Sequence, residues 1–167
     1  MTTRNLLYNI ILLLTWLGIS FCIIIMSDSI SKNFKYSEFT YSETALKHKI
    51  DNSIKHVHVR NNIKALVINI LQPLRDYLGV SININSGYRC LKLNELVGGK
   101  PTSQHVHGEA CDFIVEDYEP IEIARLIVEL KLPFDQLGVY DSFIHVSYNS
   151  RERGQVFYDK SYKGSKL

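Results

Sequence analysis

The chain has 167 residues, 46% of them hydrophobic, and its formal net charge at pH 7 is +2. This balance gives no electrostatic case for nucleic-acid binding, so we expect no nucleic-acid partner. Without its apolar N-terminal segment the chain keeps about 140 residues, which suits one domain with one hydrophobic core.

The N-terminal segment, residues 6–26, contains no charged side chain and is long enough to cross a bilayer as a helix. We interpret it as a transmembrane or signal-anchor helix behind a short tail, residues 1–5. A cleaved signal peptide is the alternative, and it would give a secreted protein. The apolar run is longer than the usual signal-peptide core, and no A-x-A cleavage site follows it. We therefore expect a single-pass membrane protein.

The rest of the chain is predicted to form one folded unit behind a polar tether. The tether, residues 27–37, reads SDSISKNFKYS. The domain follows over residues 38–160, and residues 161–167 form a C-terminal tail. Nearly all of the chain after the apolar segment is thus available to a single core.

Helices are indicated at four places. Thr40 and Glu43 have capping-box spacing, which predicts a short helix that ends near Asp51. Apolar residues recur at helical spacing over residues 61–78, where Pro73 should kink the helix or mark its last turns. Two shorter helices are predicted over residues 91–97 and 120–130.

Alternating or short apolar runs predict strands in the second half of the chain. These runs cover residues 80–85, 110–115, 137–140 and 143–148. A few helices with several consecutive later strands favour an α+β fold, with an antiparallel sheet and flanking helices.

The most informative stretch follows the first predicted strand, from Ser86 to Asp112. It contains an arginine after a tight glycine turn, then a polar glycine-rich loop, then His105 and Asp112. A second histidine, His145, lies in the last predicted strand. Two histidines and one carboxylate form a three-ligand set that leaves a fourth zinc position open for water. An open position is what a catalytic metal needs.

Four motifs along the chain together resemble a known family. They are SGYR at residues 86–89, LN-x-x-VGG at 93–99, SQH-x-x-GEA-x-D at 103–112 and HVS at 145–147. Occurring in this order, they resemble the zinc peptidases of family M15, which include D-Ala-D-Ala carboxypeptidases and phage L-alanyl-D-glutamate endopeptidases. The stretches SETALKHKIDN, LQPLRDYLG and PFDQL are also similar to the short peptidase domains of this family. The similarity runs roughly from Phe39 to Phe157.

The resemblance implies a hedgehog-type fold and one zinc ion per chain. The implied zinc ligands are His105, Asp112 and His145. Arg89 matches the family arginine near the substrate, and its guanidinium suits bidentate contact with a carboxylate. Ser103 and Gln104 fall in the family's SQH loop and are predicted to bind substrate. A structural salt bridge to Asp112 or Glu109 is the alternative role for Arg89.

Other polar residues of this stretch have plainer interpretations. His107 is expected to be an exposed loop histidine, and Glu109 to be exposed or to support the ligands from behind. We expect Tyr88 to pack in the core. Cys90 and Cys111 flank the site and could form a disulfide in an oxidising compartment, or remain as two buried thiols.

The sequence departs from the family pattern at the position of the general base. Many enzymes of the family have a glutamate a few residues before the last histidine, and Ser142 stands at that position here. Asp141 is the nearest acidic residue, and on an extended strand it would share a face with His145. We therefore predict Asp141 as a catalytic residue beside Arg89; a plain turn aspartate is the alternative.

These observations predict a membrane-anchored zinc metallopeptidase with its catalytic domain on the cell-wall side. It would hydrolyse peptide bonds in peptidoglycan stem peptides with a zinc-activated water, as a carboxypeptidase or an endopeptidase. Cell lysis and wall remodelling would look alike in the sequence. The alternatives are a catalytically weak or inactive zinc-containing wall-binding module and, less favoured, a metal-free adaptor. We expect a monomer.

Overall fold

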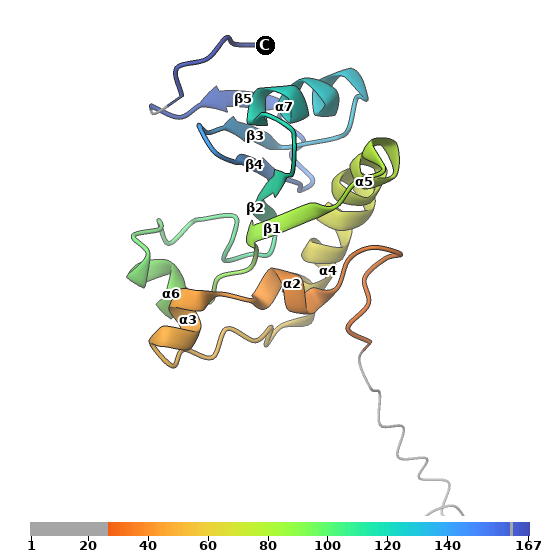
Figure 1. Cartoon of the computed structure of the whole chain (residues 1–167). Coiled ribbons are helices and arrows are strands. Elements are labelled where there is room, and N and C mark those ends of the chain that lie inside the picture. The colour runs from red at the N-terminus through yellow and green to blue at the C-terminus, as the bar shows by residue number, and fades with distance from the viewer. Residues whose placement is uncertain (1–26, 161) are drawn as a thin grey trace, which may run out of the picture.

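The computed structural model describes residues 27–160 and 162–167. It combines a five-stranded sheet with helices, which confirms the predicted α+β class (Figure 1). The predicted membrane-spanning segment, residues 6–26, lies outside the described residues. Within the described part of the chain, no helix has the length and apolar character needed to cross a bilayer.

The sheet has the strand order β1-β2-β4-β3-β5. Its strands are β1 (Ile82–Ser86), β2 (Ala110–Val115), β3 (Gln136–Val139), β4 (Ile144–Ser147) and β5 (Gln155–Tyr158). β1 with β2, β2 with β4 and β3 with β4 are antiparallel pairs, as predicted. β5 was not predicted, and it pairs parallel to β3. Because β2 and β3 already occupy both edges of β4, the returning strand pairs with the free edge of β3.

One row of residues crosses the whole sheet on the same face. Ser86 is paired with Asp112, Asp112 with His145, His145 with Gly138, and Gly138 with Phe157. The neighbouring row of the other face is apolar and includes Cys111, Val146, Leu137 and Val156. Because side chains alternate between faces, this register separates a polar face from the core.

The core face of the sheet is covered by helices. The predicted helix over residues 61–78 is found as three consecutive segments, α4 (Val57–Leu66), the π-helical η1 (Val67–Leu71) and α5 (Gln72–Leu78). Pro73 lies in the first turn of α5. Proline has no N–H and crowds the carbonyl four residues earlier, and a wider π turn lies just before it. Pro73 therefore marks the last turns of the helix, which is one of the two predicted outcomes. α7 (Pro120–Glu129) packs on β2, β3 and β4, and all these elements share one core cluster.

Short helices form the part of the molecule on the other side of β1 (Figure 1). They are α2 (Tyr36–Thr40), α3 (Glu43–Lys47) and α6 (Leu91–Leu96). The N-cap of α3 is Ser42, whose hydroxyl accepts a hydrogen bond from the Ala45 amide at 3.2 Å. The helix therefore begins two residues after the predicted Thr40, and it ends at Lys47 rather than near Asp51.

The segment predicted as a tether, residues 27–37, is part of the folded domain. Ile30, Phe34 and Tyr36 are buried in the core cluster, and Ser29 forms a β-bridge with Lys35. The Ser31 hydroxyl donates a hydrogen bond to the Gln72 side chain at 2.7 Å. The tether was predicted because most residues of this segment are polar. Its three large apolar residues are buried, and this burial favours a packed conformation over a free tether.

Two isoleucines of η1 test the core. Ile70 is fully buried, whereas Ile68 is 45% exposed in the same π turn. We expect Ile70→Ala to lower the free energy of unfolding by about 2–5 kcal/mol, since it removes buried surface and leaves a cavity. Ile68→Ala, the matched control, should cost less than about 1 kcal/mol. Chemical denaturation of the full chain in detergent measures both; equal losses would contradict this packing.

Candidate metal centre

Three potential metal ligands meet on the polar face of the sheet. Asp112 lies on β2 and His145 opposite it on β4, while His105 comes from the loop before β2. One ligand atom from each residue lies within 4.8 Å of the other two. His145 Nδ1 is 2.8 Å from Asp112 Oδ1, and His105 Nε2 is 3.4 Å from the same oxygen. Zinc ligands at tetrahedral positions lie roughly 3.4 Å apart, so this group could hold a metal ion.

His105 is fixed by a hydrogen bond on the side away from the other ligands. Its Nδ1 lies 2.7 Å from the Gly87 carbonyl oxygen, which can only accept, so Nδ1 carries a proton and Nε2 is the ring nitrogen that faces the other ligands. A Cβ at Gly87 would lie 2.6 Å from the Phe39 backbone. Glycine is therefore needed where this carbonyl supports the ligand.

Asp112 is kept ionised by its neighbours. Burial raises the pKa of Asp112, but hydrogen bonds from His105 and His145 outweigh it and hold the pKa well below the usual 3.8. A carboxylate that stays ionised with two ring nitrogens beside it suits a cation, because metal ligands must be deprotonated.

Arg89 lies beside the ligand carboxylate. Its Nη2 is 4.0 Å from Asp112 Oδ2, and 18% of its side chain is exposed. Burial lowers the pKa of Arg89, and the charge of Asp112 partly offsets this. Its buried Nε has no hydrogen-bond partner among the described residues. The guanidinium thus keeps a donor free while balancing the charge of Asp112.

Asn52, which sequence analysis missed, holds the backbone on both sides of Arg89. Its amide nitrogen donates to the carbonyls of Thr40 and Tyr88, each at 2.9 Å. Its side-chain oxygen accepts from the Cys90 amide at 2.8 Å. Asn52 is the last residue of the SETALKHKIDN stretch, which is similar to the family. The resemblance of that stretch could therefore have pointed to Asn52.

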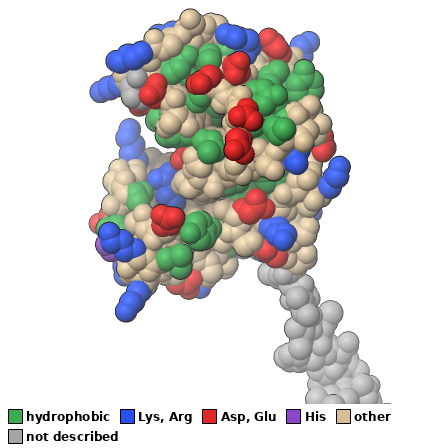
Figure 2. All heavy atoms as spheres, in the orientation of Figure 1, with side chains coloured by type: hydrophobic (Ala, Val, Ile, Leu, Met, Phe, Trp, Pro, Cys, Tyr) green, Lys and Arg blue, Asp and Glu red, His purple; other side chains and the backbone are tan. Residues whose placement is uncertain are grey.

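Two hollows lie near the ligand group, one lined by Arg89 beside Asp112 and the other lined by His145. One, of about 530 Å³, lies between β1, α3 and α6 and is lined by Arg89 and Tyr88 among others. The other, of about 350 Å³, lies beside residues 100–104 and is lined by Tyr140 and His145. Figure 2 shows the visible face hollowed between the sheet and the lobe of α3 and α6. The second hollow therefore gives access to His145, and the first gives access to Arg89.

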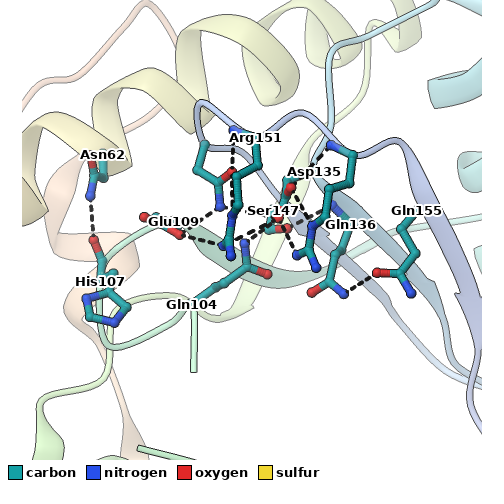
Figure 3. Close-up of polar contacts among 11 residues, drawn as sticks. Asn62, Gln104, His107, Glu109, Asp135, Gln136, Ser147, Arg151 and Gln155 are labelled. Atoms are coloured by element: carbon teal, nitrogen blue, oxygen red, sulfur yellow. Dashed lines mark hydrogen bonds and ion pairs between the residues drawn. The ribbon is translucent and has the colours of Figure 1, made fainter. Parts of the chain in front are cut away.

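Ser103 and Gln104, the predicted substrate residues, line the second hollow. The amide nitrogen of Gln104 is already engaged, because it donates to Asp135 Oδ2 at 2.8 Å (Figure 3). Asp135 is fully buried and also accepts two hydrogen bonds from the Arg153 guanidinium, at 2.8 and 2.6 Å. Gln104 therefore anchors the loop that carries His105, a role that sequence analysis did not identify. Asp135 belongs to the PFDQL stretch of the resemblance.

The remaining polar residues lie away from the ligand group. His107 is exposed, and its carbonyl accepts from Asn62 (Figure 3). Glu109 accepts from Asn149 at 2.9 Å, beside Asp135. Tyr88 is buried in the core, as predicted.

Asp141, the predicted base, lies in the exposed turn between β3 and β4. Because β4 begins only at Ile144, the alternation of side chains along a strand does not place the Asp141 carboxylate. Its catalytic role stays a prediction.

Cys90 and Cys111 are both free thiols rather than a disulfide, but only Cys111 is buried, whereas Cys90 is half-buried. Cys111 is fully buried on the core face of β2, and burial raises its pKa well above the ordinary value. A buried thiol held in its protonated form is a poor nucleophile and a poor metal ligand.

Zinc content tests the ligand group. We expect the full chain, loaded with zinc and dialysed, to keep one ion, and His105→Ala, Asp112→Ala and His145→Ala to lose it. His107→Ala is the matched control, because this exposed histidine lies two residues from His105 and should keep the ion. Elemental analysis of the dialysed proteins measures the ratio; equal zinc in His105→Ala and His107→Ala would contradict the assignment.

The buried carboxylate predicts a pH dependence. The Arg153 hydrogen bonds outweigh burial and hold the pKa of Asp135 well below the usual 3.8. A depressed pKa adds stability that is present above about pH 4 and is lost as the pH falls further. Asp135→Asn should therefore lower the melting temperature at pH 7, and the difference should shrink at pH 3. Exposed Asp117→Asn is the control, and should change the melting temperature little at either pH.

Comparison with known proteins adds one match. The family model of Peptidase M15 matches residues 32–147, well over half of the chain, and includes all three ligands. No curated protein matches the sequence. Because this match covers most of the folded domain and includes the His105–Asp112–His145 group, the chain belongs to the Peptidase M15 family.

Proposed function

We propose that this chain is a zinc-dependent peptidase that hydrolyses peptide bonds in peptidoglycan stem peptides. The observation that carries the proposal is the His105–Asp112–His145 group, with His145 in the wall of one open hollow and Arg89, beside Asp112, in the wall of another. A bound zinc ion would supply a Lewis acid and an acidified water at this group. The family match supports a peptidase, and the donor set supports zinc over harder cations such as magnesium or calcium.

The surrounding residues have defined parts in this proposal. Asp112 and the two histidines hold the ion, and the Gly87 carbonyl keeps the His105 ring in one tautomer and orientation. Arg89 binds a substrate carboxylate with the guanidinium nitrogens that Asp112 does not use. Stem peptides carry terminal and side-chain carboxylates, so Arg89 suits both a carboxypeptidase and an endopeptidase. Asp141 would take the proton from the attacking water if its turn brings the carboxylate to the site.

A catalytically weak zinc-containing wall-binding module is the second candidate. It is favoured by the turn position of Asp141 and by Ser142 at the expected glutamate position. Within the described residues, the metal group contains no acidic residue besides the ligand Asp112. Such a protein would bind zinc and wall but would not release products.

Location completes the proposal. Residues 6–26 would anchor a monomer in the membrane with the peptidase on the cell-wall side. If the segment is instead cleaved, the protein is secreted. The mass of the mature N-terminus, measured on protein from its native host, separates the two.

Muropeptide release tests the function. The full chain, freed of metal and held in detergent, is incubated with purified sacculi, with or without one equivalent of zinc. We expect new products only with zinc, named by mass spectrometry, and a loss of at least about 100-fold in His105→Ala, since ligand loss exceeds the usual effect of a supporting residue.

His107→Ala should release the same products as the unchanged chain. A chain that carries stoichiometric zinc and sediments with sacculi, but releases nothing, would replace the peptidase with the wall-binding module.

A further inference from the structure

Tyr140 lies at the edge of the metal centre without being one of its ligands. It follows the last residue of β3 and is half-buried in the wall of the hollow that also contains His145. Its amide donates to the Phe143 carbonyl at 3.1 Å, which closes the turn between β3 and β4. The backbone of Tyr140 is thus held by the same hairpin that carries a metal ligand.

The ring of Tyr140 is held by two other aromatic rings. It stacks on Phe143 with 4.2 Å between centroids and 14° between planes, and it meets Phe157 edge-on at 6.3 Å and 83°. Phe157 lies 6.1 Å from the His145 ring. These contacts leave the ring little freedom to rotate away from the ligands, since such arrangements are favoured pair geometries.

Gly138 gives Phe157 its place in this group. A Cβ at Gly138 would lie 2.4 Å from the Phe157 ring, so no larger residue fits below it. Gly138 is also paired with His145 across β3 and β4. The row across the sheet therefore positions Tyr140 and the ligand His145 together.

The phenol of Tyr140 interacts electrostatically with the charged groups of the site. Burial raises the pKa of Tyr140, the carboxylates of Asp112 and Asp159 raise it further, and Arg89 opposes them. The phenol therefore stays protonated at neutral pH, where it can donate a hydrogen bond without a change of charge.

Peptide hydrolysis needs such a donor. Addition of water to the amide carbonyl places negative charge on the carbonyl oxygen, and a donor fixed in advance stabilises this charge without reorganisation. Arg89 is partly committed to Asp112, 4.0 Å away. A neutral phenol in the wall of the hollow that contains His145 avoids competition with that ion pair.

We infer that Tyr140 is a catalytic residue of the proposed peptidase, and that its hydroxyl donates a hydrogen bond to the carbonyl oxygen of the scissile amide. The bond strengthens as the oxygen becomes negative, and the proton stays on the phenol. This inference rests on the proposed function and adds to it a residue outside the four motifs. If Tyr140 were only a packing residue, its ring alone would matter.

Tyr140→Phe separates these roles because it keeps the ring and removes only the hydroxyl. Tyr158→Phe is the matched control: it removes a phenol hydroxyl from the strand position next to Phe157, where the hydroxyl accepts from the Leu167 amide at 2.7 Å. All three full chains are loaded with zinc in detergent. The measurements are zinc content, melting temperature, kcat and KM on purified muropeptides, and the Kd of a phosphinate analogue of the bond that is cut.

We expect kcat of Tyr140→Phe to fall on the order of 100-fold with KM nearly unchanged, as for loss of one oxyanion donor. The phosphinate, which mimics the tetrahedral state, should bind more weakly by a similar factor, while zinc content and melting temperature stay the same. Tyr158→Phe should match the unchanged chain in every measurement.

Equal kcat and equal phosphinate affinity in Tyr140→Phe and the unchanged chain would overturn this inference and leave the peptidase intact. A fall in zinc content or melting temperature that accounts for the lost rate would also overturn it, in favour of a structural role. No products from the unchanged chain would overturn the proposed function, and this inference with it.

Discussion

The pairing of Asp112 with His145 across β2 and β4 is the constraint on which the rest of the site depends. A shift of one residue would turn His145 into the core and expose Val146, because strand side chains alternate between faces. The apolar row beside the ligands, with Cys111 and Val146 fully buried, makes that shift costly. The hydrophobic effect thus places two metal ligands opposite each other without any metal contributing to their register.

The third ligand is placed by hydrogen bonds rather than by a strand. His105 lies in a loop, and the Gly87 carbonyl fixes its ring at 2.7 Å. Asn52 holds the turn that carries Gly87 by bonding the backbone next to it. Buried Asp135 anchors Gln104, the residue before the ligand. Because a buried polar group without a partner costs about 1–3 kcal/mol, these networks favour one loop conformation.

The charges of the site follow from this arrangement. Asp112 is ionised between two histidines, and Arg89 lies near enough to offset part of its charge. His145 lines one hollow and Arg89 lines another, so a substrate can approach the site while His105 stays almost fully buried. The aromatic group of Tyr140, Phe143 and Phe157 adds a rigid wall beside His145. Rigid support of this kind is what a metal site needs to keep its geometry when the ion changes partners.

The sequence by itself determined the fold class and the family, and it predicted the candidate ligand set. Strand alternation and helical spacing are local, so four strands and the long core helix could be predicted from them. The order of SGYR, SQH-x-x-GEA-x-D and HVS was specific enough to predict three candidate ligands that the fold brings together. Local patterns failed where tertiary contacts decide: β5 pairs with the free edge of β3, and Phe34 draws the supposed tether into the core.

Only the tertiary structure decided which residues support the ligands. Asn52, Asp135 and Tyr140 lie far from His105 in the sequence or on other elements, and no spacing rule connects them to it. It also places Asp141 in an exposed turn, so the face that Asp141 was predicted to share with His145 does not follow from strand geometry, because β4 begins only at Ile144. Short motifs can predict candidate ligands because metal binding requires particular residue types. The residues that hold these ligands in place depend on which backbone groups become buried together, and only the folded structure determines which groups those are.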